Sequence, residues 1–435
     1  MPVLRDPLDR RIGALALAAL GTLAVEPLYV LVDTAIVGRL GTTPLASLAL
    51  AAGVLITVTA LFNFLAYGTT QRVAHHRGAH RFDDAAATAT QAIRLAIALG
   101  APVAAAVAAL ARPLLSLLGG EGDVLEGAVT YLRIAAVGLP FVLVALAGMG
   151  VQRGVGDLRT PLVIVVVGNL ANVVLEVVAV YGLDLGLAGS AWSTTVVQVG
   201  VAIAFVYSVR PHLAAWRAPG DPAERRALLT AGRSLVLRVV ALIGALTGST
   251  AVAARIDEPT LAAHQIALQL FGFLALALDA WAIPAQMLVA EDLGAGGAGA
   301  ATDVGRRVIR LAVLTGLVVG VALAVTAPWL PLVFTTDPAV QSRATVALVL
   351  LAVLQPLGGI AFALDGVLIG AADYRFLGRA MAAALAVWLP LAVLVLAVPA
   401  LGIAGVWTSL IVWMSTRAGL LGRRFTTRRW LPAVP

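Results

Sequence analysis

The chain contains an internal duplication with one fixed offset. The segment RGVGDLR returns as IGAADYR, which puts Gly154 and Gly370 216 residues apart. The segment LGLAG returns as LGIAG at the same offset, with Gly186 matched by Gly402. One offset for both pairs indicates that two halves carry the same landmarks in the same order. We therefore expect two similar bundles, with domains at 1–215 and 216–435.

The composition is that of a membrane protein. The 435 residues are 60% apolar and 12% charged, with a mean hydropathy of +0.97, whereas a soluble domain is nearer half apolar and a quarter charged. Apolar runs long enough to cross a bilayer as helices recur along the chain. We predict twelve of them: 12–38, 45–71, 88–111, 124–150, 160–182, 187–209, 228–254, 260–290, 306–334, 340–370, 376–399 and 402–420. The predicted fold class is an all-α polytopic membrane protein with six helices in each half, and such repeats are typical of secondary transporters.

Two residue types are missing, and each absence excludes a class of chemistry. The sequence has no cysteine, so disulfides, thiolate catalysis and cysteine-ligated metals are excluded. It also has no lysine, and a Walker A phosphate loop needs one. The metalloprotease motif HExxH and the hydrolase motif GxSxG do not occur either. We expect a protein that is not an enzyme and that needs no cofactor.

The arginines are sorted by loop, so the net charge of +7 does not indicate a nucleic-acid partner. Most of the arginines lie before the first apolar run, in every second connection between runs, and in the C-terminal tail. We count Arg417 among the tail residues. The opposite connections hold only Arg39, Arg112, Arg255 and Arg343. By the positive-inside rule both termini are cytoplasmic, in what we expect to be a bacterial inner membrane. The basic connector 210–233 is interpreted as a topology anchor and linker, with a regulatory lipid site as the alternative.

Ionisable side chains inside a membrane segment are candidates for function because they are costly there. The first apolar run carries two acids, Glu26 and Asp33, which are seven residues apart and share one helix face. Pro27 stands between them and predicts a hinge, because it removes a backbone hydrogen bond. An apolar cavity favours the neutral acid over the carboxylate. We therefore interpret Asp33 and Glu26 as proton-coupling or ion-coupling groups, with Asp33 also facing substrate.

A second polar cluster lies in the fifth run. Asn169, Asn172 and Glu176 share one helix face, and Thr194 follows in the sixth run. Their oxygens could hold a proton or a sodium ion, since hard cations take oxygen ligands. We assign Asn172, Glu176 and Thr194 to ion coupling and Asn169 to the substrate cavity. Interhelical hydrogen bonding is the alternative for the amides and the hydroxyl.

The second half has fewer acids at membrane depth. Asp279 lies in ALALDAWAIPAQ and Asp365 in FALDGVLIG, and we assign both, with Gln265, to the substrate cavity. The positions that match Asp33 and Glu176 are Ser249 and Ala392. The two halves have therefore diverged chemically, and the first half keeps the better proton site.

The motifs resemble those of a known family. The carrying segments are EPLYVLVDTAIVGRLGTTPLASLAL at 26–50, RGVGDLRTPL at 153–162, NVVLE with LGLAGSAWSTT at 172–195, and FALDGVLIGAAD at 362–373. In these segments the chain resembles the multidrug and toxic compound extrusion transporters, in their DinF-like branch. The resemblance implies two six-helix bundles related by a pseudo-twofold axis along the membrane normal, around a V-shaped central cavity. It also implies an antiporter that exports organic cations in exchange for protons or sodium ions.

The resemblance also implies roles for individual residues. Asp33 matches the first-helix acid treated as the protonation site in this branch, and Asn172 and Thr194 match polar positions around the same cavity. Glu176 stands where relatives commonly have Asp, which lengthens the side chain by one methylene. Asp365 matches the acid of the branch's second-half DG motif.

Three alternatives to a proton-coupled, monomeric exporter of organic cations stay open at this point. A sodium-coupled exporter would use Asp33, Asn172, Glu176 and Thr194 as oxygen ligands. A flippase for lipid-linked precursors would need arginines at membrane depth, for which Arg133 and Arg238 are the candidates. Intramembrane proteolysis would need Asp279 and Asp365 to meet.

Overall fold

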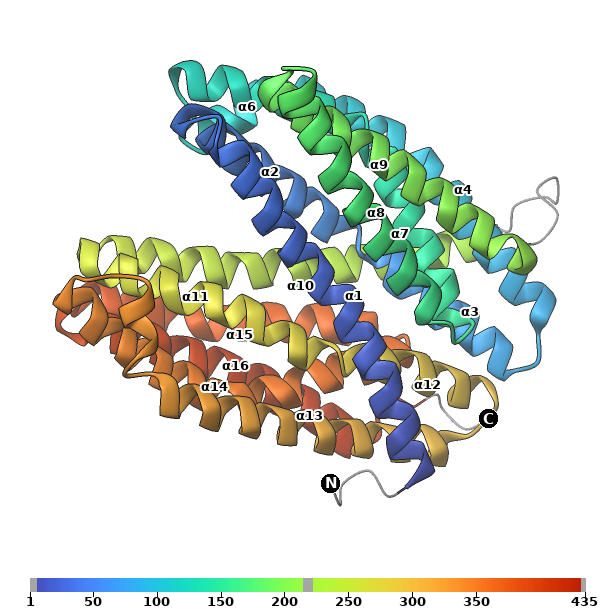
Figure 1. The fold of residues 1–435 in the computed structure, drawn as a ribbon. Helices are drawn as coiled ribbons and strands as arrows, with labels where there is room; N and C mark the ends of the chain where they lie inside the picture. The colour runs from blue at the N-terminus through green and yellow to red at the C-terminus, as the bar shows by residue number, and fades with distance from the viewer. Residues whose placement is uncertain (1–5, 214–221, 432–435) are drawn as a thin grey trace. The chain divides into compact units, whose positions relative to one another are not determined.

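The computed structural model describes residues 6–213 and 222–431, and within them the regular structure is helical (Figure 1). The chain divides into two compact units. Unit 2 is Gly21–Gly232, and unit 1 combines Met1–Leu20 with Arg233–Pro435. The domain boundary predicted at 215/216 lies outside the described residues.

The first of the two repeats forms most of unit 2. Its helices are α1 (Pro7–Gly38), α2 (Thr42–Phe62), α3 (Phe64–Gly78), α4 (Phe82–Ala109), α5 (Ala111–Leu117), α6 (Gly122–Ala136), α7 (Leu139–Gly154), α8 (Arg159–Val177), the π-helix η2 (Val178–Gly182), α9 (Gly186–Val209) and the short 3₁₀ helix η3 (Arg210–His212). Helix α7 packs against α3, α4 and α9, while α8 lies against α9 and α2 against α6.

The second repeat forms most of unit 1. Its helices are α10 (Pro222–Ala254), α11 (Glu258–Asp279), α12 (Ala282–Gly294), α13 (Ala298–Thr326), η4 (Leu330–Val333), α14 (Pro338–Gly370), α15 (Tyr374–Ala397), η5 (Pro399–Leu401) and α16 (Gly402–Thr426). Helix α14 is the centre of this unit and packs against α11, α12, α13 and α16.

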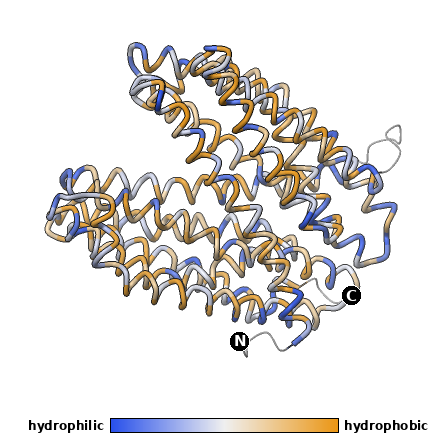
Figure 2. The backbone as a smooth tube through the Cα atoms, viewed as in Figure 1, coloured by the Kyte–Doolittle hydropathy of each residue, from blue (hydrophilic) through white to orange (hydrophobic). Residues whose placement is uncertain are grey.

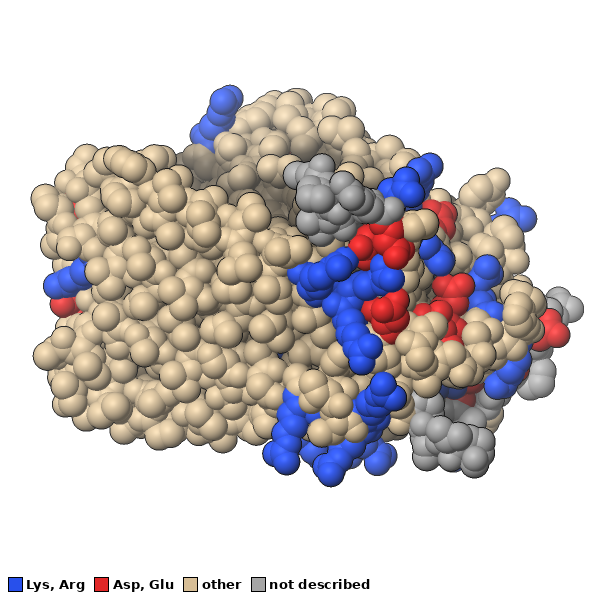
Figure 3. All heavy atoms as spheres, turned by 90° about the horizontal axis from the view of Figure 1, so that it is seen from below, with Lys and Arg blue, Asp and Glu red and all other residues tan. Residues whose placement is uncertain are grey.

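The helices confirm the predicted membrane spans. In the described residues, eleven helices or helix pairs are long and apolar enough to cross a bilayer, and α6 with α7 makes a twelfth that is bent by 50°. Apolar residues run along the helices in Figure 2, and on the face drawn in Figure 3 the charged side chains gather toward one end beside a broad uncharged area. The predicted all-α polytopic fold class is therefore confirmed.

The duplication is visible in backbone contacts as well as in the amino-acid sequence. A Cβ on Gly154 would lie 3.1 Å from the carbonyl oxygen of Thr70, and one on Gly370 would lie 2.6 Å from that of Gln286. Thr70 and Gln286 are themselves 216 residues apart. Only glycine allows the backbones to approach this closely. The repeated motif thus performs the same packing task in both units.

The turn after each of these glycines also repeats. Gly156 and its partner Ala372 both have positive φ, at 90° and 57°. In the first turn the carboxylate of Asp157 accepts hydrogen bonds from the backbone N–H groups of Arg159 and Thr160, at 2.9 and 3.0 Å. Burial opposes ionisation of Asp157, but hydrogen bonds from the Thr160 side chain and backbone outweigh it and lower the pKa of this carboxyl. The turn is closed by backbone donors.

The first helix of each repeat begins in the opposite unit. Helix α1 passes from unit 1 into unit 2 after Leu20, and α10 passes from unit 2 into unit 1 after Gly232. An acid near the start of each helix holds it in the unit where it begins. Asp9 of α1 accepts from Arg307 at 3.2 Å and Arg310 at 2.6 Å, both on α13.

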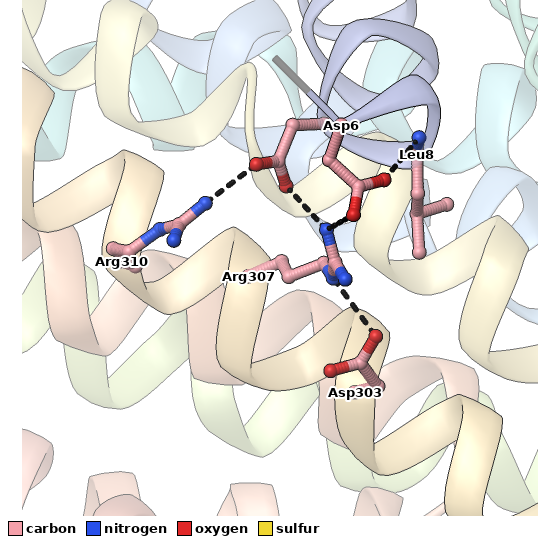
Figure 4. A network of polar contacts seen from close by, with 6 residues as sticks. Asp6, Leu8, Asp303, Arg307 and Arg310 are labelled. Carbon is pink, nitrogen blue, oxygen red and sulfur yellow. Dashed lines mark hydrogen bonds and ion pairs between the residues drawn. The ribbon is translucent and has the colours of Figure 1, made fainter. Parts of the chain in front are cut away.

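Figure 4 shows the surroundings of Arg307 and Arg310, where Asp6 also pairs with Arg307, at 2.8 Å. The backbone N–H of Leu8 and the Arg307 guanidinium lower the pKa of Asp6. On α10 the matching anchor is Glu224, which pairs with Arg72 and lies 3.4 Å from His76. Both crossing helices are therefore tied down at their first turn.

Candidate functional site

Three helices of unit 2 each contribute two polar side chains one helical turn apart. The pairs are Tyr29 with Asp33 on α1, Asn172 with Glu176 on α8, and Ser190 with Thr194 on α9. Residues at i and i+4 lie on the same helix face. The spacing alone therefore directs both members of a pair to the same side of their helix.

Hydrogen bonds join these pairs across the helices. Ser190 donates to Asp33 Oδ1 at 3.0 Å, which links α9 to α1. Thr194 Oγ1 lies 3.2 Å from the Tyr29 hydroxyl and accepts from Asn172 Nδ2 at 3.3 Å. The hydroxyls of α9 thus stand between the acid of α1 and the amide of α8. The structure brings Asp33, Asn172 and Thr194 together, and their coupling role stays a prediction.

Glu176 is the acid of this cluster that lacks hydrogen-bond donors. Its residue is fully buried, and neither carboxyl oxygen has a hydrogen-bond donor among the described residues. Its carboxyl group is close enough to that of Asp33 for the two to interact electrostatically. Asn172 Oδ1 is also buried without a donor. Buried acceptors are normally satisfied, so three oxygens here have unused capacity for a proton or a cation.

Local backbone features place this cluster. The π-helix η2 follows α8 directly, and π turns occur often at functional sites. A Cβ on Gly189 would lie 2.9 Å from the carbonyl oxygen of Ala179 in η2. Glycine at this position lets α9 approach the π turn, which brings Ser190 and Thr194 near α8. This explains why the LGLAG motif accompanies the site.

The other candidate residues of the first half, Glu26 and Asn169, lie near this cluster in the sequence but are less buried. Glu26 is exposed and Asn169 is half-buried. Helix α1 continues through Pro27 without a break. The hinge role of Pro27 and the coupling role of Glu26 therefore stay predictions.

Asp365 in unit 1 lies in a closed ion cluster. It is 2% exposed, and its Oδ2 accepts from both Arg238 and Arg417. Arg417 also stands 5.3 Å from the Phe362 ring and interacts electrostatically with Asp279, which is half-buried. Arg417 is thus a buried residue of α16, and counting it among the tail charges was wrong. The reason is that Arg417 lies within α16, which continues to Thr426, and its side chain turns into unit 1 to pair with Asp365.

Gln265 and His264 are neighbours on α11 but differ in burial. Gln265 is exposed, whereas His264 is buried with its Nε2 3.2 Å from Thr250 Oγ1. In the described residues, no group of three or more His, Cys, Asp or Glu side chains could hold a metal ion.

The sequence reasoning missed three members of the unit 2 cluster. Tyr29 and Ser190 stand one turn before Asp33 and Thr194, so the i, i+4 spacing could have found both. Tyr131 on α6 is buried and interacts with Ser190, Asp33 and Glu176. No local signal pointed to Tyr131, because its place depends on the packing of α6 against α9.

Comparisons with known proteins agree with this architecture. The family model MatE matches residues 18–178 and 235–394, one match in each repeat. Among curated proteins, Protein DETOXIFICATION 44, chloroplastic, from Arabidopsis thaliana is 31% identical over 97% of this chain and 84% of its own length. DNA damage-inducible protein F of Escherichia coli (strain K12) is 28% identical over 98% of this chain and 95% of its own.

Solved structures share the fold. One is described as the outward-facing conformation of a multidrug resistance MATE family transporter of the MOP superfamily. It superposes with a TM-score of 0.90 at 21% identity, over 98% of this chain and 97% of its own. With its two matched repeats, its membrane-spanning helices and these relatives, the chain belongs to the MatE family of multidrug efflux transporters.

Proposed function

We propose that this transporter exports organic cations in exchange for protons, with Asp33 and Glu176 as the coupling acids. Two carboxyl groups in contact inside a protein cannot both be ionised without a large repulsion, so one proton is shared between them. A second proton would remove the remaining negative charge. A cation and a proton would then compete for the same site, which is the requirement for exchange.

The observation that carries this proposal is the unsatisfied set of acceptors around Asp33. Both oxygens of Glu176 lack a donor, and its carboxyl interacts with that of Asp33. An ionised acid held this way would lose its hydration without replacement. A proton supplies the missing donor. The cluster is therefore best satisfied when it binds protons, and it keeps a negative charge until it binds the second one.

The charge change would bias the conformational equilibrium. A ligand shifts such an equilibrium only through its different affinity for the two states. Asp33 lies six residues after Pro27, which would serve as the hinge of α1. We assign Asn169, Gln265 and Asp279 to substrate contact, as the sequence suggested. The sequence also suggested Asp365, but its carboxylate is 2% exposed and bound by Arg238 and Arg417, so we assign it to the stability of unit 1 instead.

Sodium coupling is the second candidate. One observation favours it: Asn172 Oδ1 is a neutral, buried acceptor without a donor, and such an oxygen suits sodium better than a proton. Asp33, Glu176 and Thr194 would complete the ligands. We further propose a monomer in a bacterial inner membrane, with both termini cytoplasmic.

The test is efflux of a cationic dye from proteoliposomes under a proton gradient or a sodium gradient, each imposed separately. We expect the proton gradient alone to drive efflux, and Asp33→Asn and Glu176→Gln each to reduce it at least tenfold, about the effect of 1.4 kcal/mol on an equilibrium. Asp184→Asn is the matched control, because Asp184 is an exposed acid outside the cluster.

Other outcomes would change the assignment. Efflux driven by sodium alone would move coupling to the sodium site and make Asn172→Ala the next variant. No dye movement under either gradient would remove organic cations as substrates and favour the flippase alternative, for which Arg238 and Arg417 supply buried positive charge.

A further inference from the structure

Unit 2 carries an apolar groove between α8 and α9. It has a volume of about 440 Å³, and every residue that lines it is apolar. The residues used below are Val163, Val167 and Gly168 of α8 and Val196, Gly200 and Ala204 of α9. Val163, Val167 and Val196 are each more than half exposed. Since both helices are long enough to span a bilayer, the groove runs at membrane depth.

Two glycines form this groove. A Cβ on Gly168 would lie 2.6 Å from Val201 Cγ2, so Gly168 sets how closely the helices approach. A Cβ on Gly200 would meet no atom within 4 Å, so the space above Gly200 is open.

The second repeat differs at the equivalent positions. The residues 216 positions after Gly168, Val197 and Gly200 are Ala384, Trp413 and Thr416. Trp413 is 1% exposed and belongs to the core of unit 1, where it lies with Leu246, Phe271 and Leu354. The glycine that leaves the space at position 200 open is therefore specific to the first repeat. An apolar space of this kind, at membrane depth, takes an acyl chain without leaving any polar group unsatisfied.

Cationic side chains lie at the start of α8 and just after α9, beyond the groove residues Val163 and Ala204. Arg159 is exposed and stands one helical turn before Val163. At the facing end of α9, the guanidinium of exposed Arg210 lies 5.2 Å from the centre of the Tyr207 ring. His212 interacts electrostatically with Arg77 and Asp157 at the same end. Asp157 is the acid of this set, and its carboxylate is occupied by N–H and hydroxyl donors of its own turn.

We propose that this groove binds an anionic phospholipid, with one acyl chain between α8 and α9 and the phosphate at Arg159 and Arg210. Arginine and tyrosine at the end of a membrane helix are the side chains that favour the headgroup level. The acyl chain would lie between α8 and α9, the two helices that supply Asn172 and Thr194 to the proposed ion site. The lipid is a structural partner of unit 2, distinct from the exported substrate, so the proposal does not depend on the coupling ion.

The binding test uses the purified full chain and native mass spectrometry, with phosphatidylglycerol and phosphatidylcholine of identical acyl chains. We expect the wild type to retain phosphatidylglycerol in preference to phosphatidylcholine. Gly200→Leu fills the open space and should lose one bound molecule of either lipid. The control is Gly272→Leu on α11, because Gly272 is also exposed and a Cβ there meets nothing within 4 Å.

The double variant Arg159→Gln/Arg210→Gln tests whether these two arginines bind the lipid phosphate. Each arginine near an anionic headgroup contributes roughly a fivefold preference, so the double variant should lose about 25-fold of the preference for phosphatidylglycerol. Arg255→Gln, an exposed arginine of unit 1, is the control and should change nothing.

A site-specific measurement distinguishes a bound lipid from general contact with the bilayer. Since the chain has no cysteine, Gly200→Cys and Gly272→Cys each give one labelling position. A fluorophore at 200 should be quenched saturably by brominated phosphatidylglycerol, and one at 272 only in proportion to the lipid added. Equal, non-saturable quenching at both positions, or unchanged lipid retention in Gly200→Leu, would overturn the proposal. Displacement of the quenching lipid by a cationic dye would instead make the groove a substrate site.

Discussion

The ion cluster of unit 1 gives a prediction whose size follows from its geometry. Asp365 is 2% exposed, Arg417 1% and Arg238 8%, so water cannot replace a lost partner. One carboxylate oxygen, Asp365 Oδ2, accepts from both guanidinium groups. Asp365→Asn leaves two buried cations facing an amide, although the charge of Asp279 still acts on Arg417. Removal of one partner from a buried ion pair costs about 3–5 kcal/mol, and we expect a loss of that size.

The matched variant is Arg238→Met, which leaves Asp365 paired with Arg417. We expect Arg238→Met to lower the free energy of unfolding by less than half as much as Asp365→Asn does. We also expect Asp365→Asn to lower it less when Arg238→Met is already present. Unfolding in a denaturing detergent, followed by tryptophan fluorescence, measures all three variants against the wild type. A loss below about 1 kcal/mol for Asp365→Asn would be typical of an exposed pair and would refute the closed cluster.

Three further predictions concern packing, anchoring and pH. Gly366→Ala should destabilise unit 1 by about 1–3 kcal/mol because its Cβ would overlap the Ala282 carbonyl group, whereas Gly272→Ala should be neutral in the same thermal melt. Asp9→Asn should cost about 1.5–3 kcal/mol, since Arg307 and Arg310 lose a charged acceptor that is 3% exposed; an unchanged melting temperature would contradict the anchor. Burial opposes ionisation of Asp257, but the Thr260 backbone N–H, the Thr260 side chain and Arg343 outweigh it and lower the pKa of this helix cap. A lowered pKa stabilises the fold above the ordinary value of 3.8 and loses that contribution as pH falls below it. The stability difference between wild type and Asp257→Asn should therefore shrink below about pH 4, and a difference that grows there would show the opposite sign.

The sequence predicted the spans and one polar cluster because both depend on local patterns. Apolar runs of bilayer length mark helices regardless of what they pack against. The spacing of Asn172 and Glu176 places both on one face of α8, and the structure joins Asn172 to Thr194 at 3.3 Å. Asp33 is placed with Asn172, Glu176 and Thr194 because it is a charged residue within an apolar run. These features need no knowledge of the tertiary fold.

What the sequence could not predict depends on contacts between distant segments. Arg417 looked like a tail charge, because nothing near it in the chain shows that Asp365 lies opposite. The crossing of α1 into unit 1 rests on Asp9 meeting Arg310, which is 301 residues away. Tyr131 reaches the ion site through the packing of α6 on α9. In each case a side chain is placed by a helix that local periodicity cannot locate.

The two repeats preserve their backbone contacts and differ in their buried charges. Gly154 and Gly370 approach equivalent carbonyl groups, yet Asp33 and Glu176 correspond to Ser249 and Ala392. In the other direction, Asp365, Arg238 and Arg417 correspond to Met149, Thr22 and Val201. Each unit therefore holds a charge cluster of its own.

The chemistry of the two clusters differs in a way that assigns them different tasks. In unit 1 each buried charge faces an opposite charge, and adding a proton would break an ion pair. In unit 2 the acids face one another and hydroxyls, with acceptor oxygens that lack donors. A proton is unfavourable in the first setting and favourable in the second. The proton exchange proposed above would therefore use unit 2 for proton binding, and we expect unit 1 to keep its charge state through the cycle.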